Sequence, residues 1–185
     1  MSEIKDSGAR RKFETGAVRD IQEGKGRCDL LPLDIVADAC RLEITNDVVI
    51  DQAFPFESIN WFKQNGDVNH LLGIIKYFPE IHRTWKHIST VILEVSKHFE
   101  DGAKKYGENN WQKGIPVHCY IDSAVRHWLK YLRGDTDEPH DRAFCWNILC
   151  AAWTCYHMPE LNDFSKKADD GNGRPVQSCE WDSDS

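Results

Sequence analysis

The sequence predicts an all-α protein, and three observations lead to this fold class. Apolar residues recur at helical spacing in several segments between residues 33 and 157. Apart from a possible strand at residues 47–50, no stretch alternates apolar and polar residues for long enough to form one. The 185-residue chain has neither a GxGxxG fingerprint nor a P-loop, which belong to α/β nucleotide-binding folds. We therefore expect a helical bundle around one core.

The chain begins with an irregular, basic leader at residues 1–32. Its glycines interrupt any helical pattern, and basic residues that include Arg19 and Lys25 lie between them. A strip of this kind can wrap an anion with backbone amides and cationic side chains. A solvated N-terminal arm accounts for the same composition equally well, so both interpretations stay open.

After the leader, the pattern predicts a series of helices separated by turn signals. The segments are residues 33–45, a short helix or irregular piece in 47–63, then 67–78, 80–106, 118–132 and about 139–157. Asp67 suits an N-cap, Gly107 a C-terminal stop and Pro139 a first helical turn. The last segment is apolar on nearly every side, so we expect it to be the central buried helix. Residues 165–185 are acidic and polar, and we expect them to be a disordered tail that follows a single domain over residues 1–164.

Composition narrows the classes of partner. The net charge of −7 argues against general nucleic-acid binding, which depends mainly on neutralising phosphates. No apolar run approaches the roughly 20 residues that span a bilayer, and the first residues lack the apolar core of a secretory signal. The seven cysteines include no CxxC pair and are interpreted as reduced thiols. We therefore expect a cytoplasmic protein that binds neither nucleic acid nor a membrane.

Two predicted helices place charged side chains on one face. Four residues of segment 80–106 share a face: Glu94, His98, Asp101 and Lys105. Glu100 and Lys104 form a neighbouring pair, and Asp122 and Arg126 are one turn apart in the next helix. Such pairs are commonly surface ion pairs worth only tenths of a kcal/mol, and this interpretation stays open beside a functional one.

A denser cluster stands at the entrance of the last helix. Five acidic or imidazole groups fall within seven residues: Asp135, Asp137, Glu138, His140 and Asp141. Acids at a helix N-terminus complement its dipole, but five exceed what capping needs. Glu138 and Asp141 form an ExxD pair of hard oxygen ligands, which suit Mg²⁺ or Mn²⁺. Asn147 follows in an apolar stretch and needs a partner or a ligand, because an unpaired buried amide costs about 1–3 kcal/mol.

These motifs occur together in an order that resembles a known family. Four segments carry the resemblance: FETGAVRD, GKGRCDLLP, FEDGAKKYGENNWQKG and YIDSAVRHWLKYLRGDTDEPHDRAFCWN. They resemble the phage-type dATP/dGTP diphosphohydrolases, MazZ-like members of the MazG-related all-α nucleoside triphosphate pyrophosphohydrolases. The resemblance covers roughly residues 10–33 and 88–157. Within it, residues 88–158 are the catalytic helices and residues 41–87 are a helical insertion without an assigned role.

The resemblance implies an activity and its requirements. It implies cleavage of a purine dNTP, dGTP or dATP or both, to dNMP and pyrophosphate. It also implies Mg²⁺, with Mn²⁺ as a substitute and two or more ions per site, and a homo-oligomer, either a dimer or a tetramer. The setting implied is phage nucleotide-pool or modified-purine DNA metabolism, in the host cytoplasm if the chain is phage-encoded.

The resemblance also suggests roles for particular residues. The metal ligands and catalytic groups are expected to be Glu94, Glu100, Glu138 and Asp141, with His140 sharing the coordination. The ExxE pattern of relatives is not matched, because Lys97 stands three residues from both Glu94 and Glu100. The residues expected to bind substrate are Lys105, Arg126, Arg19 and Lys25 at the phosphates, Asp122, and Tyr106, Asn110, Trp111 and Asn147 around the nucleoside.

Two other functions stay open from the sequence. His140 and Asp141 form a literal HD pair, typical of phosphohydrolases that hold a transition metal and release triphosphate or phosphate. The other ligands of such a site could come from His82, His87, His98 and His127. A non-enzymatic helical interaction module, with the acidic cluster serving only as a cap, is the second. Product identity separates the two hydrolases, and metal-dependent stabilisation separates both from the module.

Overall fold

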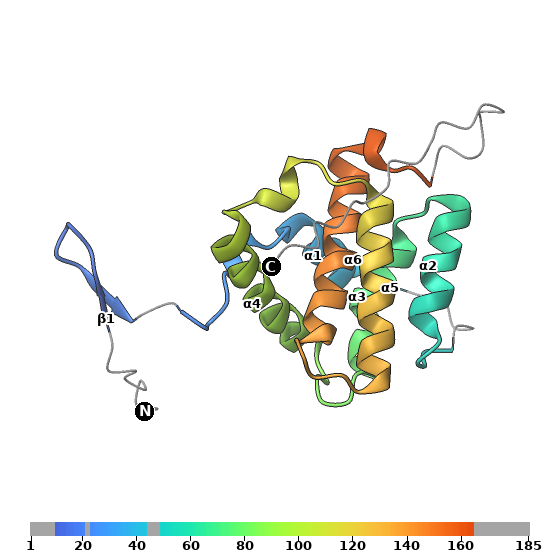
Figure 1. The fold of residues 1–185 in the computed structure, drawn as a ribbon, viewed down its shortest axis with the longest axis horizontal. Helices are drawn as coiled ribbons and strands as arrows, with labels where there is room; N and C mark the ends of the chain where they lie inside the picture. The colour runs from blue at the N-terminus through green and yellow to red at the C-terminus, as the bar shows by residue number, and fades with distance from the viewer. Residues whose placement is uncertain (1–9, 21–22, 44–48, 165–185) are drawn as a thin grey trace.

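The computed structural model describes residues 10–20, 23–43 and 49–164, except for the side chains of residues 18–20. Over these ranges the chain forms a helical bundle (Figure 1). Its helices are α1 (Leu33–Arg41), α2 (Phe54–Asn65), α3 (Asn69–Ile81), α4 (Ile88–Tyr106), α5 (Val117–Arg133) and α6 (His140–His157). The predicted all-α fold is confirmed. The predicted tail at residues 165–185 and the first two residues of the possible strand lie outside the described ranges.

Short elements accompany the helices. Three 3-10 turns are η1 (Cys28–Leu30), η2 (Asn110–Lys113) and η3 (Pro159–Leu161). Strands β1 (Arg10–Lys12) and β2 (Val18–Asp20) pair antiparallel, with Arg11 opposite Arg19. This small ribbon lies away from the helical body at one end of the molecule (Figure 1).

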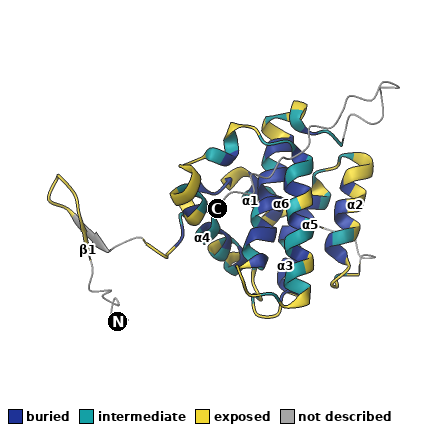
Figure 2. Cartoon of the chain, viewed as in Figure 1, coloured by how far each residue is buried: buried dark blue, intermediate teal, exposed yellow. Residues whose placement is uncertain are grey.

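Helix α6 is the centre of the bundle, as its all-round apolar pattern predicts. It packs against α5, α4, α3 and α1, and buried residues run along its length (Figure 2). Phe144, Ile148 and Leu149 on it have no exposed surface. Burying each such side chain stabilises the fold by about 1.5–3 kcal/mol. The prediction of a central buried helix is therefore confirmed.

The helix predicted over residues 80–106 is instead the end of one helix and the whole of another. Helix α3 continues through Pro79 to Ile81, and α4 begins only at Ile88. Pro79 lacks the N–H that would bond the carbonyl four residues back, yet the helix passes it and ends three residues after the predicted end at residue 78. Residues 82–87 then form a non-helical link that places His82 beside the start of α6.

The end of the leader is docked on α4. The backbone N–H groups of Gly24 and Gly26 donate to the Glu100 carboxylate at 2.9 and 2.8 Å, and that of Arg27 donates to the Ser96 carbonyl at 3.0 Å. Gly26 has φ +86°, and a Cβ there would lie 2.1 Å from Ser96 Oγ. Close approach and positive φ both require glycine here.

Among the described residues, no helix is both long and apolar enough to cross a bilayer. The longest are α4 with 19 residues and α6 with 18. Both belong to the bundle itself, and α4 carries charged groups in its last two turns.

Candidate active site

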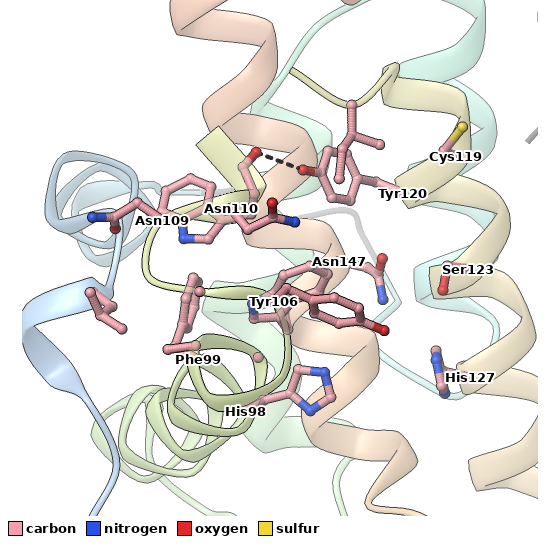
Figure 3. A pocket seen from close by; sticks show the side chains of 17 residues that line it. His98, Phe99, Tyr106, Asn109, Asn110, Cys119, Tyr120, Ser123, His127 and Asn147 are labelled. Carbon is pink, nitrogen blue, oxygen red and sulfur yellow. Dashed lines mark hydrogen bonds between the residues drawn. The ribbon is translucent and has the colours of Figure 1, made fainter. Parts of the chain in front are cut away.

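The first of two neighbouring hollows is an apolar cavity between α4, α5 and α6, closed at one end by η2. Its volume is about 400 Å³, within the range of small-molecule sites. Its walls include His98, Phe99, Tyr106, Trp111, Tyr120, Ser123, His127, Trp146 and Asn147. Figure 3 shows Tyr106 from α4 and Ser123 and His127 from α5 turned toward the space in front of Asn147. All four residues predicted to surround a nucleoside therefore meet at one cavity: Tyr106, Asn110, Trp111 and Asn147.

Three polar side chains in the wall of this cavity are buried or half-buried, and their hydrogen bonds can be followed. The Asn147 amide nitrogen donates to the Ala143 carbonyl at 2.8 Å, which answers the need for a partner inferred from the sequence. Its amide oxygen remains an acceptor on the cavity side. The indole N–H groups of Trp111 and Trp146 are buried and find no acceptor among the described residues.

The cavity contains two histidines held in the neutral form. Burial lowers the pKa of His98, against the opposing effects of Asp101 and Glu138. Burial likewise lowers the pKa of His127, and the neighbouring His140 adds to this lowering while Glu138 opposes it. Both rings are therefore uncharged at neutral pH and can accept as well as donate hydrogen bonds.

The second hollow is acidic and lies at the N-terminus of α6. Its volume is about 670 Å³ and its walls include Arg83, Trp85, Glu94, Tyr131, Asp135, Asp137, Glu138, His140, Asp141 and Arg142. Four of the five predicted metal ligands therefore share one hollow. Glu100 lines a different one, with Glu23, Arg27 and Lys104. The two hollows of the site meet at His127, whose Nδ1 lies 3.0 Å from Nδ1 of His140.

Glu94 is engaged by two cations. Lys97 Nζ lies 2.7 Å from one oxygen, and the Arg142 guanidinium bonds the other, through Nε at 2.9 Å. Burial alone would raise the pKa of Glu94, but these hydrogen bonds outweigh it and hold the pKa below its ordinary value. The carboxylate is thus ionised, and it orients Arg142 at the edge of the acidic hollow.

Asp141 is held by a histidine that the sequence suggested only as an accessory ligand. The backbone N–H groups of Thr84 and Trp85 donate to Nδ1 of His82 at 3.2 and 2.8 Å. Since Nδ1 accepts, the neutral ring has its proton on Nε2, which donates to Asp141 Oδ2 at 3.2 Å. Burial would raise the pKa of Asp141, yet the bond from His82 contributes to a net lowering. The His82 ring is stacked between Trp85 and Tyr131, at centroid distances of 4.2 and 5.3 Å.

His140 is the most enclosed group of the acidic hollow, with 2% of its surface exposed. Its Nε2 lies 2.7 Å from Asp137 Oδ1, and its Nδ1 lies 3.4 Å from Glu138 Oε1. Helix α6 begins at His140, so Glu138 precedes it and does not share a helical face with Asp141. Two groups of donors lie within 4.8 Å of one another: His127 with Glu138 and His140, and Asp135 with Asp137 and His140.

The remaining predicted substrate residues lie at other places. Asp122 and Arg126 form an ion pair on the exposed side of α5, and neither is among the residues that line the two hollows. Lys105 is exposed and its Nζ lies 5.1 Å above the Tyr106 ring, at the rim of the apolar cavity. Lys25 is exposed on the docked leader, and the side chain of Arg19 lies outside the described residues.

The part of the chain that forms these hollows matches a known protein family. Residues 80–164 match the family model described as dATP/dGTP diphosphohydrolase, N-terminal. The match confirms the predicted family. The diphosphohydrolase description names a nucleoside triphosphate diphosphatase, and the predicted enzyme class is confirmed with it. The matched region contains α4, α5 and α6, and therefore the helices that build both hollows. Searches among curated proteins and among solved structures returned no match.

One prediction about the cysteines is wrong. Cys119, which lines the apolar cavity, is disulfide-bonded rather than a thiol. Cys28, Cys40, Cys145, Cys150 and Cys155 are free, as expected. Burial raises the pKa of the three α6 thiols, which makes them inert core residues.

Proposed function

We propose that this protein hydrolyses a purine deoxynucleoside triphosphate, dGTP or dATP or both, to the monophosphate and pyrophosphate. One observation supports this beyond the family match: an aromatic cavity and an acidic hollow adjoin at His127 within the matched helices. The first has the character of a base and sugar site, and the second that of a metal-phosphate site. A nucleoside triphosphate needs both, side by side.

The apolar cavity would hold the nucleoside. Phe99, Trp111 and Trp146 supply flat apolar walls, while Tyr106, which is 59% exposed, offers a further ring on which a base can stack. The Asn147 amide oxygen offers an acceptor, and the Ser123 hydroxyl, which also lines the cavity, offers a donor or an acceptor. Because one unmet polar group discriminates strongly between hydrogen-bonding ligands, these atoms would set base choice.

The acidic hollow would hold the triphosphate and its divalent ions, Mg²⁺ with Mn²⁺ as a substitute. Such ions neutralise phosphate charge and activate a water when they are bound. Glu138, Asp141 and His140 are the residues that would hold them, because each presents a donor atom to this hollow. Glu100 is left out of this set, since its carboxylate is buried against the leader and already accepts two backbone bonds.

Cations at the same hollow would bind the phosphates. Arg142 is oriented by Glu94, and Arg83 lines the same hollow, over the ring of Tyr131. Their guanidinium groups can bind phosphate oxygens in a bidentate manner. His82 would keep Asp141 ionised and fixed in direction, because its proton sits on the bonded nitrogen.

We propose the oligomeric state and the biological role on the same basis. We expect a homo-oligomer, dimer or tetramer, acting in phage nucleotide-pool or modified-purine metabolism within the host cytoplasm, with no nucleic-acid or membrane partner. These follow from the family resemblance and the acidic charge of the chain. Light scattering coupled to gel filtration would give the oligomeric state directly.

The test is product identity. The protein would be incubated with Mg²⁺ or Mn²⁺ and each of the eight common NTPs and dNTPs, and the products resolved by ion exchange. Monophosphate and pyrophosphate from a purine dNTP are expected. Glu138→Gln should lower the rate by about a hundredfold or more, whereas Glu80→Gln, at an exposed position on α3, should not change it. Equal activity of the two variants would exclude Glu138 as a ligand.

The same assay decides the HD alternative. Triphosphate or phosphate as product would favour it over the diphosphatase. The geometry does not favour it: the His140 ring bonds Asp137 and His127, whereas the adjacent Asp141 carboxylate bonds His82. An HD site requires both side chains on one ion.

A further inference from the structure

Three donor atoms, from α5, from α6 and from the turn between them, form a compact triangle where the two hollows meet. His127 Nδ1 on α5 lies 3.0 Å from His140 Nδ1 on α6, and Glu138 Oε1 lies 3.6 and 3.4 Å from these two nitrogens. One of these contacts joins two imidazoles, and the other two join an imidazole to a carboxylate. The group differs from the carboxylate set expected from the sequence, because two of its three donors are imidazoles.

The triangle has the size of one face of a metal coordination shell. A circle through the three atoms has a radius of about 1.9 Å, so a point about 0.8 Å off their plane lies about 2.1 Å from each, the usual metal–nitrogen distance. The three ligand–metal–ligand angles would then be roughly 90–120°, as in tetrahedral or octahedral sites. One ion can therefore contact all three atoms without moving the backbone.

The surroundings of His140 favour a ligand rather than a simple hydrogen-bond partner. Asp137 accepts the proton on Nε2 of this ring at 2.7 Å, which leaves the lone pair on Nδ1 directed into the triangle. A carboxylate that holds the second nitrogen in this way is the common support of a metal-bound histidine. His140 is 2% exposed, so its ring has little freedom to turn away.

The other two members are also prepared for an ion. His127 is half-buried, and its Nδ1 lies 3.0 Å from Nδ1 of His140, so a ring with its proton on Nε2 presents the Nδ1 lone pair to the triangle. Glu138 is 44% exposed on its side chain, and Lys130 Nζ, 3.9 Å away, is the cation that an ion would displace. Glu138 and His140 line the acidic hollow, where water and phosphate oxygens can complete the coordination.

We propose that His127, Glu138 and His140 form a three-ligand site for one divalent transition-metal ion of the Mn²⁺, Co²⁺ or Zn²⁺ class. Imidazole nitrogens suit these ions better than Mg²⁺, which prefers oxygen ligands. Three protein ligands with positions left open are typical of catalytic rather than structural metals. The site rests on the proposed function for its catalytic meaning, but not for the binding of the ion.

The test uses Co²⁺ as the probe, because its visible absorption reports nitrogen ligands and coordination number. Titration of the metal-free full chain with CoCl₂ should give one absorbing site per chain. His127→Gln should weaken that binding at least tenfold, and Asp137→Asn should weaken it by about 10–100-fold through the loss of support for His140. His70→Gln, on α3 far from α6 in sequence and lining a different hollow, is the matched control and should bind as the unaltered chain does.

Two further measurements keep the outcomes separable. Circular dichroism of each metal-free variant establishes that it is folded, and His127→Gln is preferred to a change at the buried His140 for this reason. Unchanged Co²⁺ spectrum and affinity in folded His127→Gln would overturn the proposal, and so would loss of binding in Asp135→Asn alone, which would place the ion in the other donor group. Normal Co²⁺ binding without pyrophosphate release from any nucleotide would refute the proposed function and leave the site standing.

Discussion

Replacing Glu100 by glutamine separates two roles for the same carboxylate, an anchor for the leader and a metal ligand. The carboxylate is 5% exposed and accepts the N–H groups of Gly24 and Gly26, with Lys104 Nζ at 3.0 Å. Glutamine keeps one acceptor oxygen and turns its amide NH₂ toward the other backbone N–H. The variant therefore loses one charge-assisted bond, worth about 1.5–3 kcal/mol, and makes the second one neutral. We estimate the total cost at about 3 kcal/mol.

That cost should appear as local opening of the leader, because the lost bonds tie the leader and not the bundle. Trypsin cleavage after Lys25 or Arg27, followed by mass spectrometry under native conditions, measures this opening. A change of about 3 kcal/mol corresponds to roughly a hundredfold faster cleavage. Glu108→Gln is the control, since Glu108 also binds the leader, through Arg27 at 2.7 Å, but is 61% exposed on its side chain. Its loss should change the rate by less than about fivefold.

The docking of the leader should also depend on pH, because it relies on an ionised Glu100. Burial alone would raise the pKa of Glu100, but the bonds from Gly24, Lys104 and Gly26 together lower it. A lowered carboxyl pKa stabilises docking above the ordinary value of 4.5, and this stabilisation is lost as the pH falls below that value. The unaltered chain should therefore lose its protection in acid, measured with pepsin because trypsin is inactive there, and Glu100→Gln should not show this step. A cleavage rate within threefold of the unaltered chain, together with weakened Co²⁺ or Mn²⁺ binding, would refute the anchor and restore Glu100 as a ligand.

Three further predictions follow from the same contacts. Gly26→Ala forces a Cβ against Ser96 at a positive φ and should raise tryptic cleavage of the leader without changing pyrophosphate release measured with saturating nucleotide. His82→Asn removes the donor to Asp141, and we expect kcat to fall about tenfold with the same products, as measured in the ion-exchange assay. His98 and His127 have lowered pKa values, so the unfolded chain binds more protons than the folded one below about pH 6.5, and urea unfolding should show stability falling from pH 7.5 to pH 5.5.

Hydrophobic periodicity correctly predicted those features of the fold that depend on the pattern of one helix alone. Helix α6 is apolar around its whole circumference, and only a central position can bury all of it, so its place follows from sequence. The break after residue 81 does not follow in this way. Both sides of it are apolar and helical in pattern, and the link that places His82 is set by its bonds to Asp141, Thr84 and Trp85. Those are tertiary and turn contacts that spacing does not encode.

In the candidate site too, features that are local in sequence were predicted and features set by tertiary contacts were not. The density of acids before α6 predicted the hollow correctly, because the cluster is local in sequence. The pairing within it was predicted from an i,i+3 rule that applies only inside a helix, and Glu138 lies two residues before the helix begins. Freed from that face, its carboxylate lies near the rings of His127 and His140 instead of Asp141.

The spacing of His127 on its own helix explains why the sequence suggested it only as a further ligand of the HD alternative. It follows Arg126, which faces solvent, and precedes Trp128, which is fully buried, so it lies at the boundary between the two faces of α5. A boundary residue is neither core nor surface by pattern, and its role depends on what the neighbouring helix places opposite it. Here α6 begins with His140 at that level, and Asp137 fixes the proton of that ring. The antiparallel packing of α5 and α6 after a short turn thus creates a pair of imidazoles that neither helix predicts alone.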